Sequence, residues 1–484
     1  MKWIRRLLFF TLLAGYLALC PFILLYTLGI VIRPAAEESI VKTGVLFVAS
    51  APAGASILLN DRPNPKDTPA AIVDLPPGSY QLRLQLAGYR EWSRTLTVKE
   101  SSVTLADDIL MIPENWVSTK ISPEAFSTLT SLGGSAYVLL RKSSRLEELY
   151  VYSLPENRLA PVLEEGSPKR GALIRSLTTM SGSSAFLVET VKAGERTAYM
   201  ASIQWPKTVL KDVTQLIPAS YDRIEWSPSY PDDLFVQHGG RIDWIRISTA
   251  TVRNVMAKGA MGFGVAGRDL YVLETDGTLS KIDSNDGSRN PLRSFKGMPI
   301  GFLPNPPIRI VQAGSGIFLL HGSNGTFSAA LPEARTTIGG VRSFTVDWST
   351  GTVLLWKADR LGLLELWEPQ ETRTISKPEP VREPEWIWTG GTDIRQAFFV
   401  HRASHVLFQD RNRTFIVSPD FGTGERTVTE IVALQPGTSV HYADREGRLI
   451  RLEERTQQVT RTEIVPRTTV MREFLQDIGD RYGF

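Results

Sequence analysis

The sequence predicts an all-β extracytoplasmic region, a small β-sandwich plus a β-propeller of about seven or eight blades, after one N-terminal transmembrane helix. Three observations predict this class: a long apolar N-terminal segment, an alternating stretch after it, and short paired apolar strands over most of the remaining chain. The expected parts are a cytoplasmic N-terminus (1–6), a transmembrane helix (7–32), a linker (33–43), the β-sandwich (44–112), the β-propeller (116–466) and a C-terminal helical tail (467–484).

The first element is the apolar segment Leu7 to Ile32, which holds 26 residues without a charge. At about 1.5 Å per residue, such a helix crosses a hydrocarbon core of about 30 Å. A cleaved signal peptide is the alternative, but its apolar region is usually only about 7–15 residues long. Lys2, Arg5 and Arg6 precede the segment, so the positive-inside rule predicts a single-pass membrane protein with its N-terminus in the cytoplasm and its C-terminal domains outside.

Charge and cysteine content limit what the exported part can bind. The whole chain carries a formal charge of +3, and without Lys2, Arg5, Arg6 and Arg33 the remainder carries −1. Nucleic-acid binding requires clustered basic residues, so this balance predicts no nucleic-acid partner. Cys20 is the single cysteine and lies in the apolar segment, which leaves the exported part without a disulfide or a thiolate metal site.

The second element is a series of short strands with well-marked turns. Between Tyr80 and Leu86, apolar and polar side chains alternate, which is typical of a half-buried strand. Pro76-Pro77-Gly78 before this strand and Ala87-Gly88-Tyr89 after it favour turns, because proline cannot continue a β-ladder. Together with similar stretches from Gly44 onward, they predict a compact antiparallel sandwich.

Four motifs in this stretch resemble the PEGA domain: Ser50–Ala55, Thr68-Pro69, Leu75–Tyr80 and Ala87–Tyr89, in that order. Ala53 stands where the family has its naming glutamate, at an expected turn position. The resemblance implies a non-catalytic sandwich outside the cell that acts as a spacer or as a binding module. The residues that carry it, all in structural roles, are Pro52, Gly54, Ala55, Thr68, Pro69, Leu75, Pro76, Gly78, Tyr80, Gly88 and Tyr89.

The third element is a set of short apolar strands in pairs, such as Tyr137–Leu140 with Leu149–Tyr152. Strand-only repeats of about 40–50 residues are typical of propeller blades. The turns Ile224–Pro228 and Val346–Gly351 resemble those of TolB-like and WD-repeat-like propellers. A tandem of three or four β-sandwiches is the alternative fold.

Three motifs could indicate chemistry, and each has a simpler interpretation. Gly262–Gly267 matches the dinucleotide pattern, but a strand follows it where a phosphate-binding helix is required, so an inter-blade turn and no nucleotide are predicted. Asp283–Gly287 begins like a calcium loop but lacks the closing acid. His401 and His405 flank a turn. The sequence therefore predicts no catalytic residue, no metal ligand and no cofactor.

The candidate binding residues are aromatic, because exposed indoles stack on glycans and pack against proteins. They are Trp244, Trp356, Trp367, Trp386 and Trp388, although packing between blades, where most propeller tryptophans lie, is the favoured interpretation. The sequence thus predicts a membrane-anchored protein of the cell envelope that binds or scaffolds without catalysis, with an envelope protein or a surface glycan as its partner. The alternatives are a sensory ectodomain that works with a partner and a propeller glycan hydrolase whose acids come from different blades.

Overall fold

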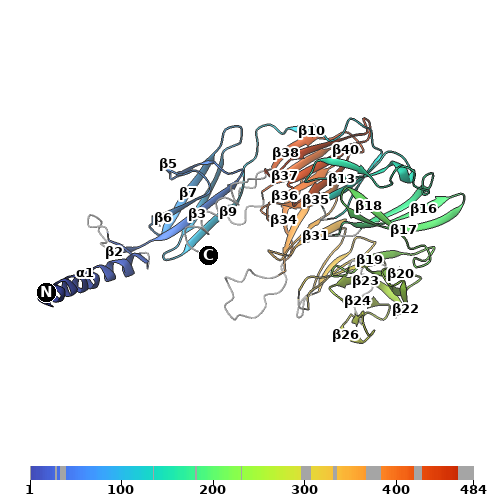
Figure 1. The fold of residues 1–484 in the computed structure, drawn as a ribbon, viewed down its shortest axis with the longest axis horizontal. Helices are drawn as coiled ribbons and strands as arrows, with labels where there is room; N and C mark the ends of the chain where they lie inside the picture. Colours follow the sequence, from blue (N-terminus) through green and yellow to red (C-terminus); the bar gives the residue numbers. More distant parts are fainter. Residues whose placement is uncertain are drawn as a thin grey trace. The chain divides into compact units, whose positions relative to one another are not determined.

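The chain divides into two compact units, with the boundary between Trp116 and Val117 (Figure 1). The computed structural model describes residues 2–27, 30–32, 40–133, 136–179, 183–230, 232–295, 307–314, 316–330, 335–366, 383–418 and 428–466. The expected helical tail, 467–484, lies outside these residues.

The N-terminal segment forms helix α1, Lys2–Thr27, of 26 residues. In the described part of the chain, no helix combines the length and the apolar character that crossing a membrane requires. The helix ends before Ile32, where the sequence predicted its end, because Ile30–Ile32 is strand β1 and pairs with β2, Ile40–Lys42. The β-branched run Ile30-Val31-Ile32 accounts for this difference, since such side chains favour strands over helices.

The first unit contains the predicted sandwich, built from two sheets with strand orders β6-β3-β9 and β5-β4-β7-β8. The strands are β3 (Gly44–Ala51), β4 (Ser56–Leu59), β5 (Arg62–Pro63), β6 (Ala70–Leu75), β7 (Gly78–Gln85), β8 (Trp92–Val98) and β9 (Val103–Leu110). The expectation of a purely antiparallel sandwich is wrong in one respect, because β3 and β9 pair in parallel. They can do so because the whole second sheet lies between them in the chain.

Alternation along β7 places its leucines in the sandwich core, as the sequence predicts. Leu82 and Leu84 are fully buried and belong to one apolar cluster with Leu46, Val48 and Ile57 from the other strands. A single core between two sheets therefore stabilises this unit.

Among the residues that the structure describes, the second unit forms a ring of eight four-stranded antiparallel sheets, of which the fourth and fifth are joined through one parallel strand pair. Seven of these sheets use four consecutive strands of the chain. The first four sheets are β11 (Thr128–Ser131), β12 (Tyr137–Arg141), β13 (Leu149–Ser153), β14 (Arg158–Pro161); β15 (Leu173–Thr179), β16 (Ala185–Lys192), β17 (Glu195–Gln204), β18 (Lys207–Asp212); β19 (Arg223–Trp226), β20 (Asp233–His238), β21 (Arg241–Arg246), β22 (Thr251–Lys258); and β23 (Ala260–Ala266), β24 (Asp269–Glu274), β25 (Thr278–Asp283), β26 (Arg289–Ser294).

The other four sheets complete the ring (Figure 1). They are β27 (Ile308–Gln312), β28 (Phe318–His321), β29 (Phe327–Ala330), β30 (Arg335–Ile338); β31 (Ser343–Asp347), β32 (Thr352–Trp356), β33 (Leu361–Glu365), β34 (Glu385–Trp388); β35 (Ile394–Val400), β36 (His405–Asp410), β37 (Arg413–Val417), β38 (Val428–Ala433); and β39 (Ser439–Ala443), β40 (Arg448–Glu453), β41 (Gln458–Glu463) with β10 (Ser118–Lys120).

The ring closes because its last sheet takes a strand from the start of the unit. Strand β10 precedes the first sheet in the chain but pairs with β41, and the first sheet packs on the last through a cluster that includes Val138, Tyr152 and Ile450. Similar apolar clusters lie between successive sheets from the first to the seventh. Neighbouring sheets thus bury their apolar faces against one another, which is the packing of a β-propeller.

The inner strand of each sheet is here the first of its consecutive strands, so the inner strands are β11, β15, β19, β23, β27, β31, β35 and β39. Inner strands of neighbouring sheets lie together: β23 pairs in parallel with β27, and β31 contacts β35. Because the inner strands run in one direction, residues at their starts gather at one end of the ring.

Candidate functional site

The motif residues of the sandwich have structural roles. Thr68 is buried, and its hydroxyl lies 2.7 Å from Ser50 Oγ and accepts a hydrogen bond from the Ala55 N–H at 3.0 Å. The Tyr80 hydroxyl donates to the Pro76 carbonyl at 2.7 Å, and the Gly88 carbonyl accepts from the N–H of Glu114. These contacts hold the turns of the sandwich in place.

The predicted binding tryptophans are mostly packing residues. Trp244 and Trp356 are 6% and 7% exposed, and each belongs to an inter-sheet cluster, so neither can stack on a ligand as predicted. Trp386 and Trp388 are half-buried against neighbouring clusters, and Trp367 lies outside the described residues. Flat indoles fill the wedge between sheets, which is the physical reason for their burial.

A tryptophan that the sequence analysis did not propose for binding is exposed instead. Trp348 follows strand β31 in a tight turn and is 58% exposed. Its neighbour Asp347 orders this turn by accepting hydrogen bonds from the N–H and hydroxyl of Ser349. Because the turn motif indicated a structural role, the sequence offered no signal that this indole faces solvent.

The glycine motif 262–267 does not form the predicted inter-blade turn; its glycines allow two strands to pack closely. Gly262 and Gly264 lie within β23, and a Cβ atom on either would overlap the carbonyl oxygen of Ile308 or Ile310 in the parallel strand β27. Gly267, with φ of +61°, makes the turn to β24 inside the same sheet. Glycine is required at positions 262 and 264 because the inner strands β23 and β27 lie too close together there to leave room for a side chain.

The other two motifs form turns. The Gly287 N–H donates to the Asp283 carbonyl at 2.9 Å, which closes the turn between β25 and β26. His401 opens the turn between β35 and β36, and the Ser404 hydroxyl donates to its carbonyl at 2.7 Å. His405 is buried at the start of β36, with Nδ1 2.9 Å from Ser404 Oγ.

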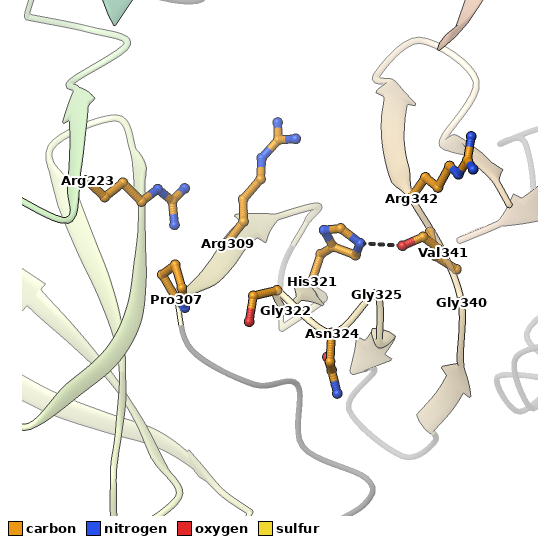
Figure 2. A pocket seen from close by; sticks show the side chains of 11 residues that line it. Arg223, Pro307, Arg309, His321, Gly322, Asn324, Gly325, Gly340, Val341 and Arg342 are labelled. Carbon is orange, nitrogen blue, oxygen red and sulfur yellow. Dashed lines mark hydrogen bonds between the residues drawn. The ribbon is translucent and has the colours of Figure 1, made fainter. Parts of the chain in front are cut away.

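A pocket of about 660 Å³ opens at the end of the ring where the inner strands begin (Figure 2). Arg223 begins β19, Arg309 is the second residue of β27, and Arg342 directly precedes β31. The turn Gly322–Gly325 between β28 and β29 completes the wall. In an antiparallel sheet, the turn between the second and third strands lies at the end where the first strand starts. Three sheets therefore contribute to one pocket.

Arg223 is held firmly by its surroundings. Its Nη1 donates to the carbonyls of Phe263 and Ile308, at 3.0 and 2.8 Å, and its Nη2 forms an ion pair with Glu225. Burial raises the pKa of the Glu225 carboxyl, against the opposing effect of the charges on Arg223 and Arg309. This arginine therefore links the third, fourth and fifth sheets.

Arg342 is also paired. Its Nη1 donates to Asp393 Oδ1 at 2.5 Å and to the Ile394 carbonyl at 2.9 Å. Asp393 accepts a further bond from Arg395 Nε at 3.1 Å, and these hydrogen bonds, that of Arg342 first, lower the pKa of the Asp393 carboxyl.

Arg309 differs from both. Its side chain is solvent-exposed, and its guanidinium carbon lies 5.0 Å from the centre of the Phe344 ring. Within the described ranges, no carboxylate or carbonyl oxygen is hydrogen-bonded to its guanidinium, although Glu225 acts on it electrostatically. Arg309 lines the pocket, where protein replaces part of the surrounding water, and this burial lowers the pKa of its guanidinium.

His321 lies between Arg309 and Val341 (Figure 2). Its Nε2 is 2.9 Å from the Val341 carbonyl, and because a carbonyl only accepts, Nε2 carries the hydrogen. Burial, above all, lowers the pKa of His321 below its ordinary value. The ring is therefore neutral at pH 7, and its Nδ1 is a hydrogen-bond acceptor.

Sequence reasoning missed this pocket. Each arginine stands at the start of an inner strand, but the chain contains 54 lysines and arginines, and nothing local marks these three. Only the order of sheets around the ring brings them together.

Comparisons with known proteins identify the domain of the first unit. The PEGA-domain family model matches residues 43–110, which confirms the resemblance given by the motifs. No curated protein matches the chain significantly. Among solved structures, the chain is similar to the β-propeller domain of Cps50 (Swd1) from Myceliophteria thermophila, at 11% identity and a TM-score of 0.38, over 73% of this chain and all of that one. It is also similar to the computationally designed protein Ika8, at 10% identity and a TM-score of 0.41, over 71% and 97% of the two chains.

Proposed function

We propose that this chain is a membrane-anchored protein of the bacterial cell envelope that binds a partner without catalysis. Helix α1, with Lys2, Arg5 and Arg6 at its start, is the proposed anchor, and the N-terminus lies in the cytoplasm. The PEGA domain is the stalk outside the membrane, and the propeller is the binding platform. PEGA domains and propellers are commonly non-enzymatic scaffolds, which supports a binding role.

The pocket at the starts of the inner strands is the observation that carries this proposal. Arg223, Arg309 and Arg342 reach it from three sheets, and pockets of about 300–1,000 Å³ are typical of ligand sites. Two of these side chains are fixed by hydrogen bonds, so the wall is ordered before a partner arrives. The partner is an envelope protein or a surface glycan.

Co-sedimentation of the detergent-purified full chain with bacterial envelope fragments tests this function. Binding to the fragments is expected, and protease treatment of the fragments distinguishes the two partners. Binding that survives protease indicates a glycan, whereas binding lost with the proteins indicates a protein partner. A chain that stays in the supernatant with both kinds of fragment would refute the proposed function.

A glycan hydrolase is a second candidate, favoured by two carboxyls at the other end of the ring. Asp347 ends the inner strand β31, and Asp444 directly follows the inner strand β39. Burial, and then the negative charge of Asp347, raise the pKa of the Asp444 carboxyl. Glycosidases use two carboxyls, and the pKa of the one that acts as general acid is raised. The exposed Trp348 is adjacent in sequence to Asp347.

Hydrolysis of 4-nitrophenyl glycosides by the full chain tests this second candidate. Activity that disappears in both Asp347→Asn and Asp444→Asn would support it. Activity that survives both changes, or no hydrolysis of any 4-nitrophenyl glycoside, would exclude it.

A further inference from the structure

We propose that the arginine pocket recognises a hydroxylated anion, such as a sugar acid or a sugar phosphate, and that Arg309 is its main contact. This inference rests on the proposed binding function and names the ligand chemistry of the same site. The shared feature of both ligands is a carboxylate or phosphate group next to free hydroxyls.

Among the described residues around the pocket, one cation has no carboxylate of its own. Glu225 is paired with Arg223, and Asp393 is paired with Arg342 and Arg395. Each of these carboxylates thus already has an arginine of its own. Arg309 has no such hydrogen-bonded carboxylate in the described part of the chain, so an excess of positive charge faces the pocket.

The shape of the Arg309 guanidinium suits an oxyanion. Its planar fork of N–H groups donates two parallel hydrogen bonds to a carboxylate or a phosphate, and such charge-assisted bonds are stronger than neutral ones. Arg309 is accessible to solvent yet lies in a concavity that lowers its pKa by desolvation. An anion there interacts with the charge through a medium of lower dielectric constant than water, which strengthens the attraction.

The phenyl ring of Phe344 helps to hold this guanidinium in place. Arg309 lies over the ring at 5.0 Å, and Phe344 is buried in the cluster between the fifth and sixth sheets. A guanidinium stacked on a fixed ring loses less conformational freedom when it binds a ligand.

The remaining wall fits the hydroxylated part of the ligand. Gly322, Gly325 and Gly340 have no side chains to fill the space, and a Cβ atom on Gly340 would point into an open region. His321 Nδ1 is an acceptor on the side of the ring away from Val341, where it can receive a hydrogen bond from a ligand hydroxyl (Figure 2). A neutral acceptor beside a cation matches a ligand that carries both a hydroxyl and an anionic group.

Isothermal titration calorimetry on the detergent-purified full chain tests this inference. The probes are D-glucuronate for a carboxylate, glucose 6-phosphate for a phosphate, and D-glucose as the neutral control. Binding of at least one anion, and much weaker binding of glucose, is expected. Which anion binds more tightly identifies the source of the oxyanion.

Variants locate the binding. Arg309→Gln is expected to weaken anion binding by about 10–100-fold, the usual cost of losing charge-assisted hydrogen bonds. Arg309→Lys keeps the charge without the fork and should weaken binding to an intermediate degree. The control is Arg413→Gln, which removes an exposed arginine that pairs with Glu430 outside the pocket, and it should bind as the unmodified chain does.

Three results would overturn the inference: no heat with either anion, equal affinity for glucose, or unchanged affinity in Arg309→Gln. Because Arg309 is exposed, its variants should fold, and unchanged thermal unfolding checks this. Anion titrations that fail while envelope fragments still co-sediment would reject the inference and leave the proposed function standing. Anion binding without co-sedimentation with envelope fragments would reject the proposed function and leave this inference about the ligand standing.

Discussion

The sandwich and the propeller stabilise their sheets in different ways. The sandwich has one apolar core between two sheets that come from about 70 consecutive residues, whereas the propeller has separate cores between neighbouring sheets and becomes complete only when β10 pairs with β41. The sandwich thus depends on contacts between residues that are close in sequence. The propeller also depends on contacts between its two chain ends.

The two units also differ in where their candidate residues come from. In the sandwich, the motif residues that can be recognised from sequence form turns and buried hydrogen bonds. In the propeller, the arginine pocket is formed by residues from three sheets that no local motif connects. Variants that affect one unit and spare the other test how independent the two units are.

The largest expected effect is that of Gly262→Val on the propeller. The new side chain would overlap the backbone of Ile308, so β23 and β27 could not pair, and a loss of about 4 kcal/mol or more is expected in the free energy of unfolding. Denaturant unfolding measures it. Gly339→Ala is the control, because a Cβ atom there meets no neighbour within 4 Å. Equal stability of the two variants would contradict the packing role of the motif.

The next effect is that of Leu84→Ala on the sandwich. Leu84 is fully buried, so a loss of about 2–5 kcal/mol is expected in the transition of the first unit. Leu105→Ala, at a side chain that is 61% exposed, should change little. Binding of D-glucuronate or glucose 6-phosphate should be the same in both variants. Weaker anion binding in Leu84→Ala would show that the sandwich contributes to the pocket.

Acid should lower the free energy of unfolding of the propeller through His441, which is buried in β39. Burial lowers the pKa of His441 from 6.5 to about 4, so the unfolded chain binds a proton in this range and the folded chain does not. The contribution of His441 to the free energy of unfolding is therefore fully present above pH 6.5. It is lost as the pH falls toward 4, and the loss is at most about 3 kcal/mol. Unfolding midpoints measured across this range should fall less steeply in His441→Gln. Parallel curves for the two proteins would exclude His441 as a cause.

The smallest effect is expected from Thr68→Val in the sandwich. This change removes the hydroxyl that contacts Ser50 and accepts from Ala55, at a cost of about 1–2 kcal/mol. Thr95→Val, at an exposed position of β8, is the matched control. If both variants unfold at the same denaturant concentration, the buried hydrogen bonds of the motif do not stabilise the sandwich.

The sandwich was the most predictable part of the molecule. The alternation of Tyr80–Leu86 identified the buried face of β7, and the four motifs identified the domain that the family model matches. The parallel pairing of β3 with β9 could not be predicted, because it depends on how the chain returns across the sheet and not on local alternation.

The site was the least predictable part. Trp244 and Trp356 are ordinary candidates for binding by residue type, but the ring buries them between sheets. The sequence pattern around Gly262 and Gly264 predicted a turn. Glycine is required at both positions because a Cβ atom would overlap the backbone of Ile308 or Ile310, and this contact cannot be read from the sequence.

The sequence by itself determined the all-β class, the small domain and its turns, and the repetition of short strands, because alternation and turn residues act over a few neighbouring positions. The tertiary structure alone decided the closure of the ring by β10, the packing of the glycine strands and the meeting of Arg223, Arg309 and Arg342. These features depend on contacts between residues far apart in the chain, and such contacts are defined only when every sheet has taken its place in the ring.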